Sequence, residues 1–342
     1  MPDDVVVVGA SAGGVEALRA MASGLPKDLP APVVVVLHIP PGAPSALPAI
    51  LTRAGPLPAR SAAHRLPLHN GTVYVAPADR HVLIADDHLH LSEGPTENGH
   101  RPAIDPLFRA AAASFGARAI GIVLSGTGDD GSAGLAALAR QGGGALVQEP
   151  ADALYSQMPL NALEHVPQAK ASAAIRLGSL LAQLLSSPGR VSVERPAGAQ
   201  LLIGETQIAA MSAELTSTTA LAGAEPSPLS CPSCDGLLFR LPGRPAQGFR
   251  CRVGHAWSPA SLSAHRTSNA EDALRVALRA LEEKAVTLRW LADQETRRGH
   301  PVVAGMHTAR AVAADSEAAL VRQLIPKTGP VTPETFPADA QP

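Results

Sequence analysis

The chain has 342 residues, 46% of them hydrophobic and 17% charged, with a formal net charge of −2. This composition is typical of a globular protein with a sizeable core, and the near-neutral charge excludes an electrostatic basis for nucleic-acid binding. No apolar run reaches the roughly 20 residues that a membrane-spanning helix needs, and the N-terminus lacks a secretory signal pattern. The sequence therefore predicts a cytoplasmic protein that is not embedded in a membrane.

Apolar runs alternate with amphipathic stretches from Val5 to about Leu185. This alternation predicts an α/β domain with a largely parallel sheet. A hairpin turn at 85–88 predicts that the sheet also has an antiparallel portion. We expect strands over 5–8, 33–37, 71–75, 81–84, 89–91, 120–124 and 145–147, and helices over 13–22, 45–51, 105–113 and 131–140.

The rest of the chain changes character at several points. We expect the α/β domain over 1–190, a linker over 191–228 with one helix near 200–213, a cysteine region over 229–268, a helical hairpin over 269–325 and a disordered tail over 326–342. Apolar residues at helical spacing mark the hairpin: Leu274, Leu278, Leu281, Ala285 and Leu288. Packing within the hairpin, self-association and binding of a partner through these helices all remain open.

Three of the expected strands end next to residues that together could form a serine hydrolase site. Ser11, His38 and Asp130 follow the runs 5–8, 33–37 and 120–124. In an open parallel sheet the carboxyl ends of neighbouring strands meet in one crevice, so these residues can lie close together. The spacing Gly9-x-Ser11-x-Gly13 also matches a nucleophile elbow, in which a helix N-terminus can stabilise an oxyanion.

Each of these segments also has a simpler interpretation. The glycines around Ser11 could hold a dinucleotide phosphate, and Ser11 could only cap the helix. His38 could be a core or loop histidine, and either Asp129 or Asp130 could cap the following helix. The chain order Ser, His, Asp differs from that of α/β-hydrolases, which disfavours that fold.

The cysteine region has the spacing of a zinc site. Cys231 and Cys234 form one pair, and Cys251 and His255 form a second after a hairpin-length segment. Four such ligands suit tetrahedral zinc and leave no coordination position open, so the zinc would be structural and the region would resemble a zinc ribbon. Reduced thiols with incidental spacing are the alternative.

Five ordered motifs resemble the catalytic domain of the CheB family of chemotaxis methylesterases. They lie at 8–14, 37–40, 73–77, 101–105 and 124–131. The resemblance covers about the first 190 residues and implies a doubly wound α/β fold, with a mainly parallel sheet and helices on both faces. It also implies hydrolysis of glutamyl methyl esters on methyl-accepting chemotaxis receptors, which some family members combine with glutamine deamidation.

The resemblance implies roles for particular residues. The family's nucleophile falls on Ser11, its base on His38 and its acid on Asp130. Its oxyanion donors fall on the backbone N–H groups of Ala12 and Thr127, and its catalysis uses no cofactor. The segment containing Arg101 and Asp105 also matches, but these two residues are as well explained by a helix start as by substrate contact.

Two other functions remain open. The chain could be a serine esterase or deamidase acting on another protein, or a non-catalytic scaffold or regulatory module of a chemosensory pathway. A nucleotide-binding domain is disfavoured, because His38-Ile39-Pro40 stands where an acidic ribose-binding residue is expected. Family members usually carry an N-terminal receiver domain, whereas the first strand here begins at Val5, so control by such a domain is not expected.

Overall fold

The computed structural model describes residues 2–42, 45–186, 199–210, 223–241 and 248–325. It divides into two compact units, Met1–Ser263 and Ala264–Pro342, which are described separately below. The expected tail 326–342 lies outside the described residues, as do 191–198 and 211–222 of the expected linker.

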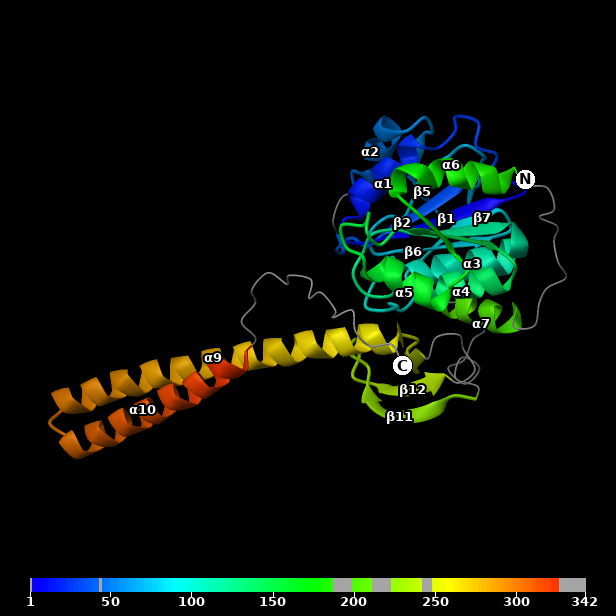
Figure 1. The fold of residues 1–342 in the computed structure, drawn as a ribbon. Helices are drawn as coiled ribbons and strands as arrows, with labels where there is room; N and C mark the ends of the chain where they lie inside the picture. Colours follow the sequence, from blue (N-terminus) through cyan, green and yellow to red (C-terminus); the bar gives the residue numbers. More distant parts are fainter. Residues whose placement is uncertain (1, 43–44, 187–198, 211–222, 242–247, 326–342) are drawn as a thin grey trace, which may run out of the picture. The chain divides into compact units, whose positions relative to one another are not determined.

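A seven-stranded sheet forms the centre of the first unit, where β1, β2 and β5 are labelled in Figure 1. Its strand order is β10-β9-β8-β1-β2-β5-β3. Every neighbouring pair in it is parallel. The central strands are valine- and isoleucine-rich and buried on both faces, as parallel strands covered by helices must be. The seven strands are β1 (Val5–Ala10), β2 (Val33–Leu37), β3 (Ala59–Ser61), β5 (Val73–Val75), β8 (Ala119–Val123), β9 (Gly144–Gln148) and β10 (Lys170–Ser172).

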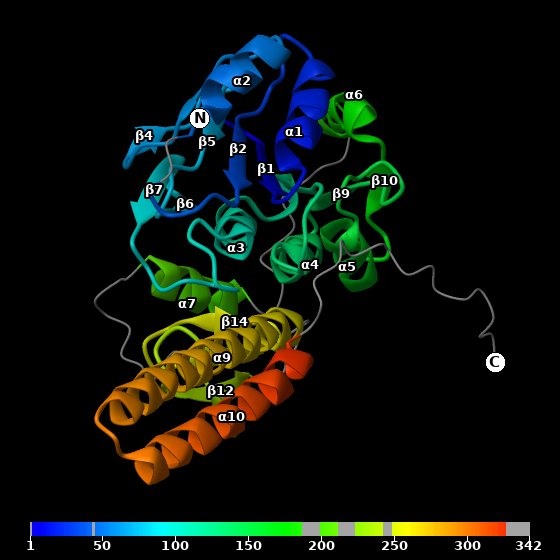
Figure 2. The ribbon, with the colours of Figure 1, turned by 90° about the vertical axis from the view of Figure 1, so that its left-hand side faces the viewer.

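Helices cover both faces of this sheet (Figures 1 and 2). One apolar cluster joins the sheet to the first, second and sixth helices, and another joins it to the third, fourth and fifth. The predicted fold class, a doubly wound α/β domain, is therefore confirmed. The six helices are α1 (Gly14–Ser23), α2 (Leu47–Ala54), α3 (Ile104–Phe115), α4 (Ser132–Arg140), α5 (Gln157–His165) and α6 (Ala174–Leu185).

The expected antiparallel portion is a separate sheet and not part of the central one. Strands β6 (His81–Ala85) and β7 (His88–Ser92) form the predicted hairpin, and β4 (Leu66–Pro67) pairs with β7. Asp86 and Asp87 turn the hairpin with φ of 49° and 58°, a conformation that aspartate tolerates better than most residues.

A second, smaller sheet follows within the first unit. Helix α7 (Ala199–Ala209) precedes a four-stranded antiparallel sheet of β11 (Glu225–Ser230), β12 (Leu237–Leu241), β13 (Gly248–Cys251) and β14 (Ala256–Trp257). We call residues 225–258 the Cys/His module. Its small core contains Cys231, Cys251, Leu238 and Trp257, and Leu262, just beyond the module, packs against them.

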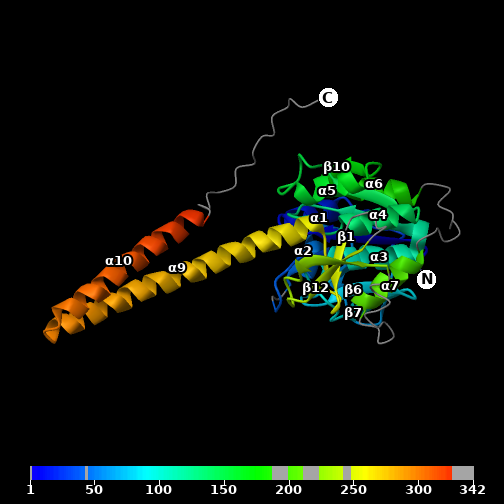
Figure 3. The same cartoon turned by 90° about the horizontal axis from the view of Figure 1, so that it is seen from below.

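The second unit is a helical hairpin, in which α9 (Pro259–Arg297) and α10 (Pro301–Leu324) run side by side (Figures 1 and 3). Helix α9 begins ten residues before the expected start of the hairpin at 269. Of the apolar residues predicted at helical spacing, Ala285 is fully buried. Ion pairs such as Lys284–Glu317 (3.4 Å) connect the two helices. Among the described helices, none combines the length and apolar character needed to cross a membrane.

Candidate functional site

The ends of β1, β2 and β8 lie at one level of the sheet, because their ladder hydrogen bonds continue past the strands. The Ser11 N–H donates to the Ser125 carbonyl (2.9 Å), and the His38 N–H donates to the Ala10 carbonyl (3.1 Å). The chain runs outward from β1 to one side through β2 and to the other through β8. This is the switch point at which open α/β sheets form their ligand crevices.

Three side chains form a continuous hydrogen-bonded row at this point. His38 Nδ1 lies 3.2 Å from Ser11 Oγ, and His38 Nε2 lies 2.8 Å from Asp130 Oδ2. The side chains of His38 and Asp130 are only 6% and 3% exposed. When Nε2 carries the proton shared with Asp130, Nδ1 is free to accept the proton of Ser11.

The carboxylate of Asp130 sits at the N-terminus of α3. Besides His38, it accepts hydrogen bonds from the backbone N–H groups of Ile104 (2.6 Å) and Asp105 (3.3 Å) and from Asn98 Nδ2 (3.2 Å). Burial raises the pKa of Asp130. The hydrogen bond and charge of His38, together with the hydrogen bond from the Ile104 N–H, lower this pKa by more than burial raises it. The net pKa lies below its ordinary value, so this acid is ionised at neutral pH.

Asp105 has the reciprocal arrangement with α4. Its Oδ1 accepts from the backbone N–H groups of Gly131 (3.0 Å) and Gly134 (2.6 Å). Burial and the nearby Asp130 charge raise the pKa of Asp105 well above its ordinary value. Asp105 therefore caps a helix, and in the described residues no hydrogen bond joins its carboxylate to His38. Arg101 pairs with Asp79 (2.6 Å), which supports the structural interpretation of both residues.

Asp129, the other aspartate considered from the sequence, points elsewhere. Its Oδ1 accepts from the hydroxyls of Ser258 (2.8 Å) and Ser261 (2.7 Å), at the start of α9. Of the two adjacent carboxylates, Asp130 is the one beside His38.

Two further residues contact the row and were not identified from the sequence. Asn98 reaches Asp130, and the His100 ring stacks on His38 with centroids 3.7 Å apart. Both belong to a tight turn in which Glu97 and His100 pair, and Asn98 and Gly99 have φ of 52° and 79°. The dipeptide Asn-Gly favours such a turn, so the turn could have been predicted, although its position beside Asp130 could not.

Small residues surround Ser11. A Cβ at Gly126 would lie 2.8 Å from Ser11 Cβ and 2.0 Å from Met158 Sδ, so only glycine fits there. Gly13 adopts a φ of 69°, which opens α1 directly after the serine. Ser11 itself is not among the described residues with positive φ, so the strain of an α/β-hydrolase elbow is absent at this serine.

The backbone N–H groups of Ala12 and Thr127 lie on the two loops that flank Ser11. In the described part of the chain, neither N–H has a protein acceptor. Helix α5 holds the second loop, because Gln157 accepts from the Gly128 N–H (3.0 Å) and Asn161 donates to the Gly128 carbonyl (2.7 Å). Both N–H groups therefore remain available to a ligand.

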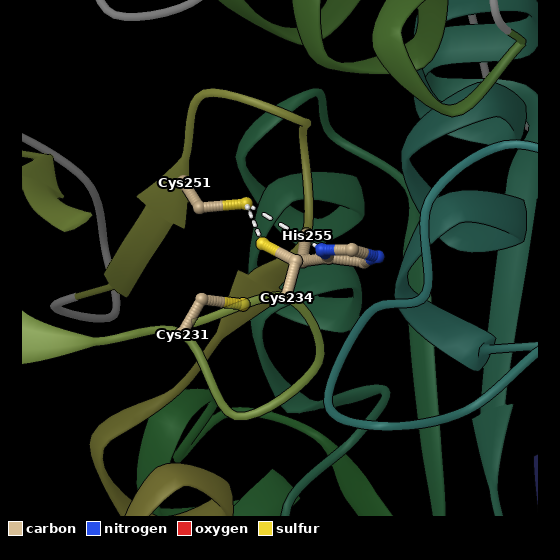
Figure 4. A group of neighbouring side chains, drawn as sticks. All are labelled: Cys231, Cys234, Cys251 and His255. Atoms are coloured by element: carbon tan, nitrogen blue, oxygen red, sulfur yellow. Dashed lines mark hydrogen bonds between the residues drawn. The ribbon is translucent and has the colours of Figure 1, made fainter. Parts of the chain in front are cut away.

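The four predicted metal ligands come together in the Cys/His module, with their side chains pointing toward one another (Figure 4). Their ligand atoms all lie within 4.8 Å of one another. Cys234 Sγ lies 3.7 Å from Cys251 Sγ, which lies 3.5 Å from His255 Nδ1. Burial and the neighbouring Cys231 raise the pKa of Cys251 to about 11. The cluster could hold a metal ion.

Comparisons with known proteins agree with the fold and with the motifs. A family model described as CheB methylesterase matches residues 6–181. Two proteins of Anaeromyxobacter dehalogenans, named protein-glutamate methylesterase/protein-glutamine glutaminase 2 and 3, are 40% identical over 161 residues and 45% identical over 157 residues. These alignments cover 47% and 45% of this chain, and 47% and 46% of the relatives.

A solved structure is similar as well. The crystal structure of the Thermotoga maritima CheB methylesterase catalytic domain matches with a TM-score of 0.51 and 30% identity, and covers 53% of this chain and 98% of that one. Fold and site thus define a doubly wound α/β protein with a Ser-His-Asp row at its switch point. The chain belongs to the CheB methylesterase family. It spans about half the length of the curated relatives that it matches.

Proposed function

We propose that the chain is a protein-glutamate methylesterase, with Ser11 as nucleophile, His38 as general base and Asp130 as the acid that orients the base. The observation that carries this proposal is the hydrogen-bonded row from Ser11 Oγ through His38 to Asp130, at 3.2 and 2.8 Å. Asp130 holds the imidazole in one tautomer and stabilises the imidazolium that forms when His38 takes a proton. Its lowered pKa keeps the necessary negative charge.

The reaction proceeds in two halves. His38 takes the Ser11 proton as Oγ attacks the ester carbonyl, and the imidazolium then returns the proton to the departing methoxide, which leaves as methanol. Water attacks the resulting acyl-enzyme with His38 again as base, and Ser11 is released. A neutral ester becomes a carboxylate, so the substrate gains one negative charge.

The oxyanion of each tetrahedral intermediate is bound by the backbone N–H groups of Ala12 and Thr127. Their lack of a protein acceptor among the described residues supports this role. Because the donors are backbone groups, the exposed Thr127 side chain is not itself required. The same geometry suits a primary amide, and the relatives named glutaminases favour a second activity on glutamine.

The substrate we propose is the glutamyl methyl ester of a methyl-accepting chemotaxis receptor, reached from the cytoplasm. The family resemblance supports this choice. The helical hairpin supplies a further candidate contact surface for self-association or for a partner, because Trp290 and Met306 are 69% and 61% exposed.

The Cys/His module would hold zinc through Cys231, Cys234, Cys251 and His255. In a tetrahedral site, Zn–S bonds of about 2.3 Å and a Zn–N bond of about 2.0–2.1 Å give S···S and S···N separations of about 3.8 and 3.5 Å. The observed Cys234–Cys251 and Cys251–His255 separations of 3.7 and 3.5 Å fit these values, and all four ligand atoms lie within 4.8 Å of one another. With four protein ligands the ion would stabilise the module and take no part in ester hydrolysis. One zinc per chain is expected in the reduced protein, and its absence would contradict this assignment.

Methanol release from methylated receptor membranes tests the enzymatic proposal. Ser11→Ala should abolish release, whereas Ser23→Ala, an exposed serine at the end of α1, should retain it. Release that survives Ser11→Ala would refute the mechanism. No release by the wild type from any methylated receptor would instead favour a scaffold.

A further inference from the structure

The Cys/His module is joined by backbone pairing to the turn that contacts the catalytic row. Ala256 forms a parallel bridge with Glu97. The Asn98 N–H donates to the Ala256 carbonyl (2.8 Å), and the Ala256 N–H donates to the Thr96 carbonyl (3.3 Å). Ala256 directly follows the metal ligand His255, so the ligand loop and the turn are held to one another.

Buried charges connect the same two parts. Arg250, on β13, is 1% exposed and lies 3.6 Å from Glu97, which also pairs with Arg109 of α3 (2.7 Å). Arg109 lies 3.0 Å from Glu205 of α7. Two arginines and two glutamates from four segments therefore balance one another in the interior. Separating the module from the turn would expose or unpair these charges, which is costly.

Asn98 carries this connection to the catalytic acid through its side chain. Its Oδ1 accepts from the Ser258 N–H (2.9 Å), and its Nδ2 donates to Asp130 Oδ1 (3.2 Å) and to Asp105 Oδ2 (3.4 Å). One carboxamide thus links the end of the module to the catalytic carboxylate. The φ of 52° at Asn98 restricts the choice of residue, because few side chains other than asparagine tolerate it.

The residue next to the catalytic acid is held from the same side. The hydroxyls of Ser258 and Ser261 both donate to Asp129 (2.8 and 2.7 Å). Ser258 lies three residues after the ligand His255. The loop that carries Asp130 is therefore fastened twice to the segment that follows the metal ligands.

We propose that Asn98 is a positioning residue for Asp130, and that metal binding by Cys231, Cys234, Cys251 and His255 keeps Asn98 in place. The module then acts as a structural support of the esterase site, and loss of its metal weakens Ser11 as a nucleophile. This inference rests on the proposed roles of Ser11, His38 and Asp130.

The first experiment changes Asn98 in the full-length chain. Asn98→Gly keeps the positive φ accessible and removes the amide, and Asn98→Asp keeps the acceptor for the Ser258 N–H but removes the donor to Asp130. A hydrogen bond to a charged group corresponds to about tenfold or more in rate. We expect kcat for methanol release to fall about tenfold in Asn98→Gly and further in Asn98→Asp, with KM changed less than twofold.

Asn70→Gly is the matched control, because exposed Asn70 precedes Gly71 in an Asn-Gly turn at the opposite end of β2 from His38, where the Gly71 N–H donates to the Ala31 carbonyl. It should retain the wild-type kcat. Equal kcat for Asn98→Gly and Asn70→Gly would overturn the positioning role, as would a loss in Asn98→Gly that appears in KM alone.

The second experiment measures the reactivity of Ser11 without any receptor. A fluorophosphonate labels Ser11 covalently, and the rate constant of this labelling is measured in the wild type. The rate constant and the zinc content are both determined before and after treatment with a chelator. We expect labelling to slow at least tenfold as zinc is lost and to recover when zinc is restored. Hydrogen exchange at the Asn98 and Ile104 amides should quicken on zinc loss, while exchange in β1 stays unchanged.

The outcomes distinguish failure of the zinc coupling from failure of the proposed esterase activity. Labelling and exchange that do not change after complete zinc removal would overturn the coupling and leave the esterase proposal intact. A wild-type Ser11 that the reagent does not label would refute the proposed function itself, and this inference with it.

Discussion

Replacing Asp130 with asparagine preserves its shape and removes its charge. Each carboxylate oxygen faces two donors: Oδ2 faces His38 Nε2 and the Ile104 N–H, and Oδ1 faces the Asp105 N–H and Asn98 Nδ2. Asparagine offers only one acceptor oxygen, so two of the four donors lose their acceptor whichever way the amide turns. Hydrogen bonds to charged groups contribute about 1.5–3 kcal/mol each, so the loss is about 3–6 kcal/mol.

Part of this loss appears in catalysis. With the amide NH₂ toward His38, the imidazole takes the opposite tautomer; with the oxygen toward His38, the imidazolium still lacks its counter-charge. We expect kcat/KM for methanol release to fall about 10³- to 10⁴-fold, the scale seen when a triad acid is made neutral. Asp129→Asn is the comparison, because its hydroxyl partners can donate equally well to an amide oxygen, and it should lose less than about tenfold.

Retention of more than a tenth of the wild-type kcat/KM by Asp130→Asn would refute this prediction, as would a larger loss in Asp129→Asn than in Asp130→Asn. Thermal unfolding of both variants, measured alongside, separates a lost helix cap from a lost catalytic charge.

Three further predictions concern the surroundings of the site. Arg250→Met should lower the free energy of unfolding by about 3 kcal/mol in denaturant titrations, because it removes one ion-pair partner from the buried Glu97. Arg240→Met, which removes an exposed ion pair, should lower it by less than about 1 kcal/mol. Similar losses in the two variants would contradict the buried network. Gly126→Ala should reduce covalent labelling of Ser11 even when combined with Met158→Ala, because the clash with the Cβ of Ser11 persists. Full recovery of labelling in the double variant would contradict this clash. Asp105 has a raised folded pKa, so its own contribution to stability falls as pH rises above the ordinary value of 3.8. Asp105→Asn should therefore gain stability relative to the wild type between pH 4 and pH 7, and an equal difference between the two proteins at both pH values would count against this.

The sequence predicted the fold well where the pattern is local. Unbroken valine runs indicate buried parallel strands. The backbone hydrogen bonds of the sheet continue past each strand and bring the residues just beyond the strands together. The same reasoning placed the 81–91 hairpin correctly but assigned it to the wrong sheet. Hydrophobic alternation specifies a strand and its buried face, and it carries no information on which distant strand will be the neighbour.

The site was predictable only in part for a similar reason. The choice between Asp129 and Asp130 depends on which carboxylate faces His38, and that is decided by the N-terminus of α3, a distant segment. Asn98 contacts Asp130 from a turn that also binds Ser258, 160 residues further along the chain. The cysteine spacing, by contrast, encodes its own geometry within a short segment, so the cluster of four ligand atoms could be predicted from the sequence.

The double attachment of Asp130 changes how a site of this kind should be recognised. Its carboxylate closes the first turn of α3 and also faces His38, so a chain that had lost the reaction would still need an acceptor at this position in order to fold. In the described residues, the side chains of Ser11 and His38 hydrogen-bond only to one another and to Asp130. These side-chain hydrogen bonds hold no backbone group in place, so the start of α3 does not depend on them. An intact Asp130 therefore indicates only that the start of α3 is preserved, whereas an intact Ser11–His38 pair indicates that the catalytic function is preserved.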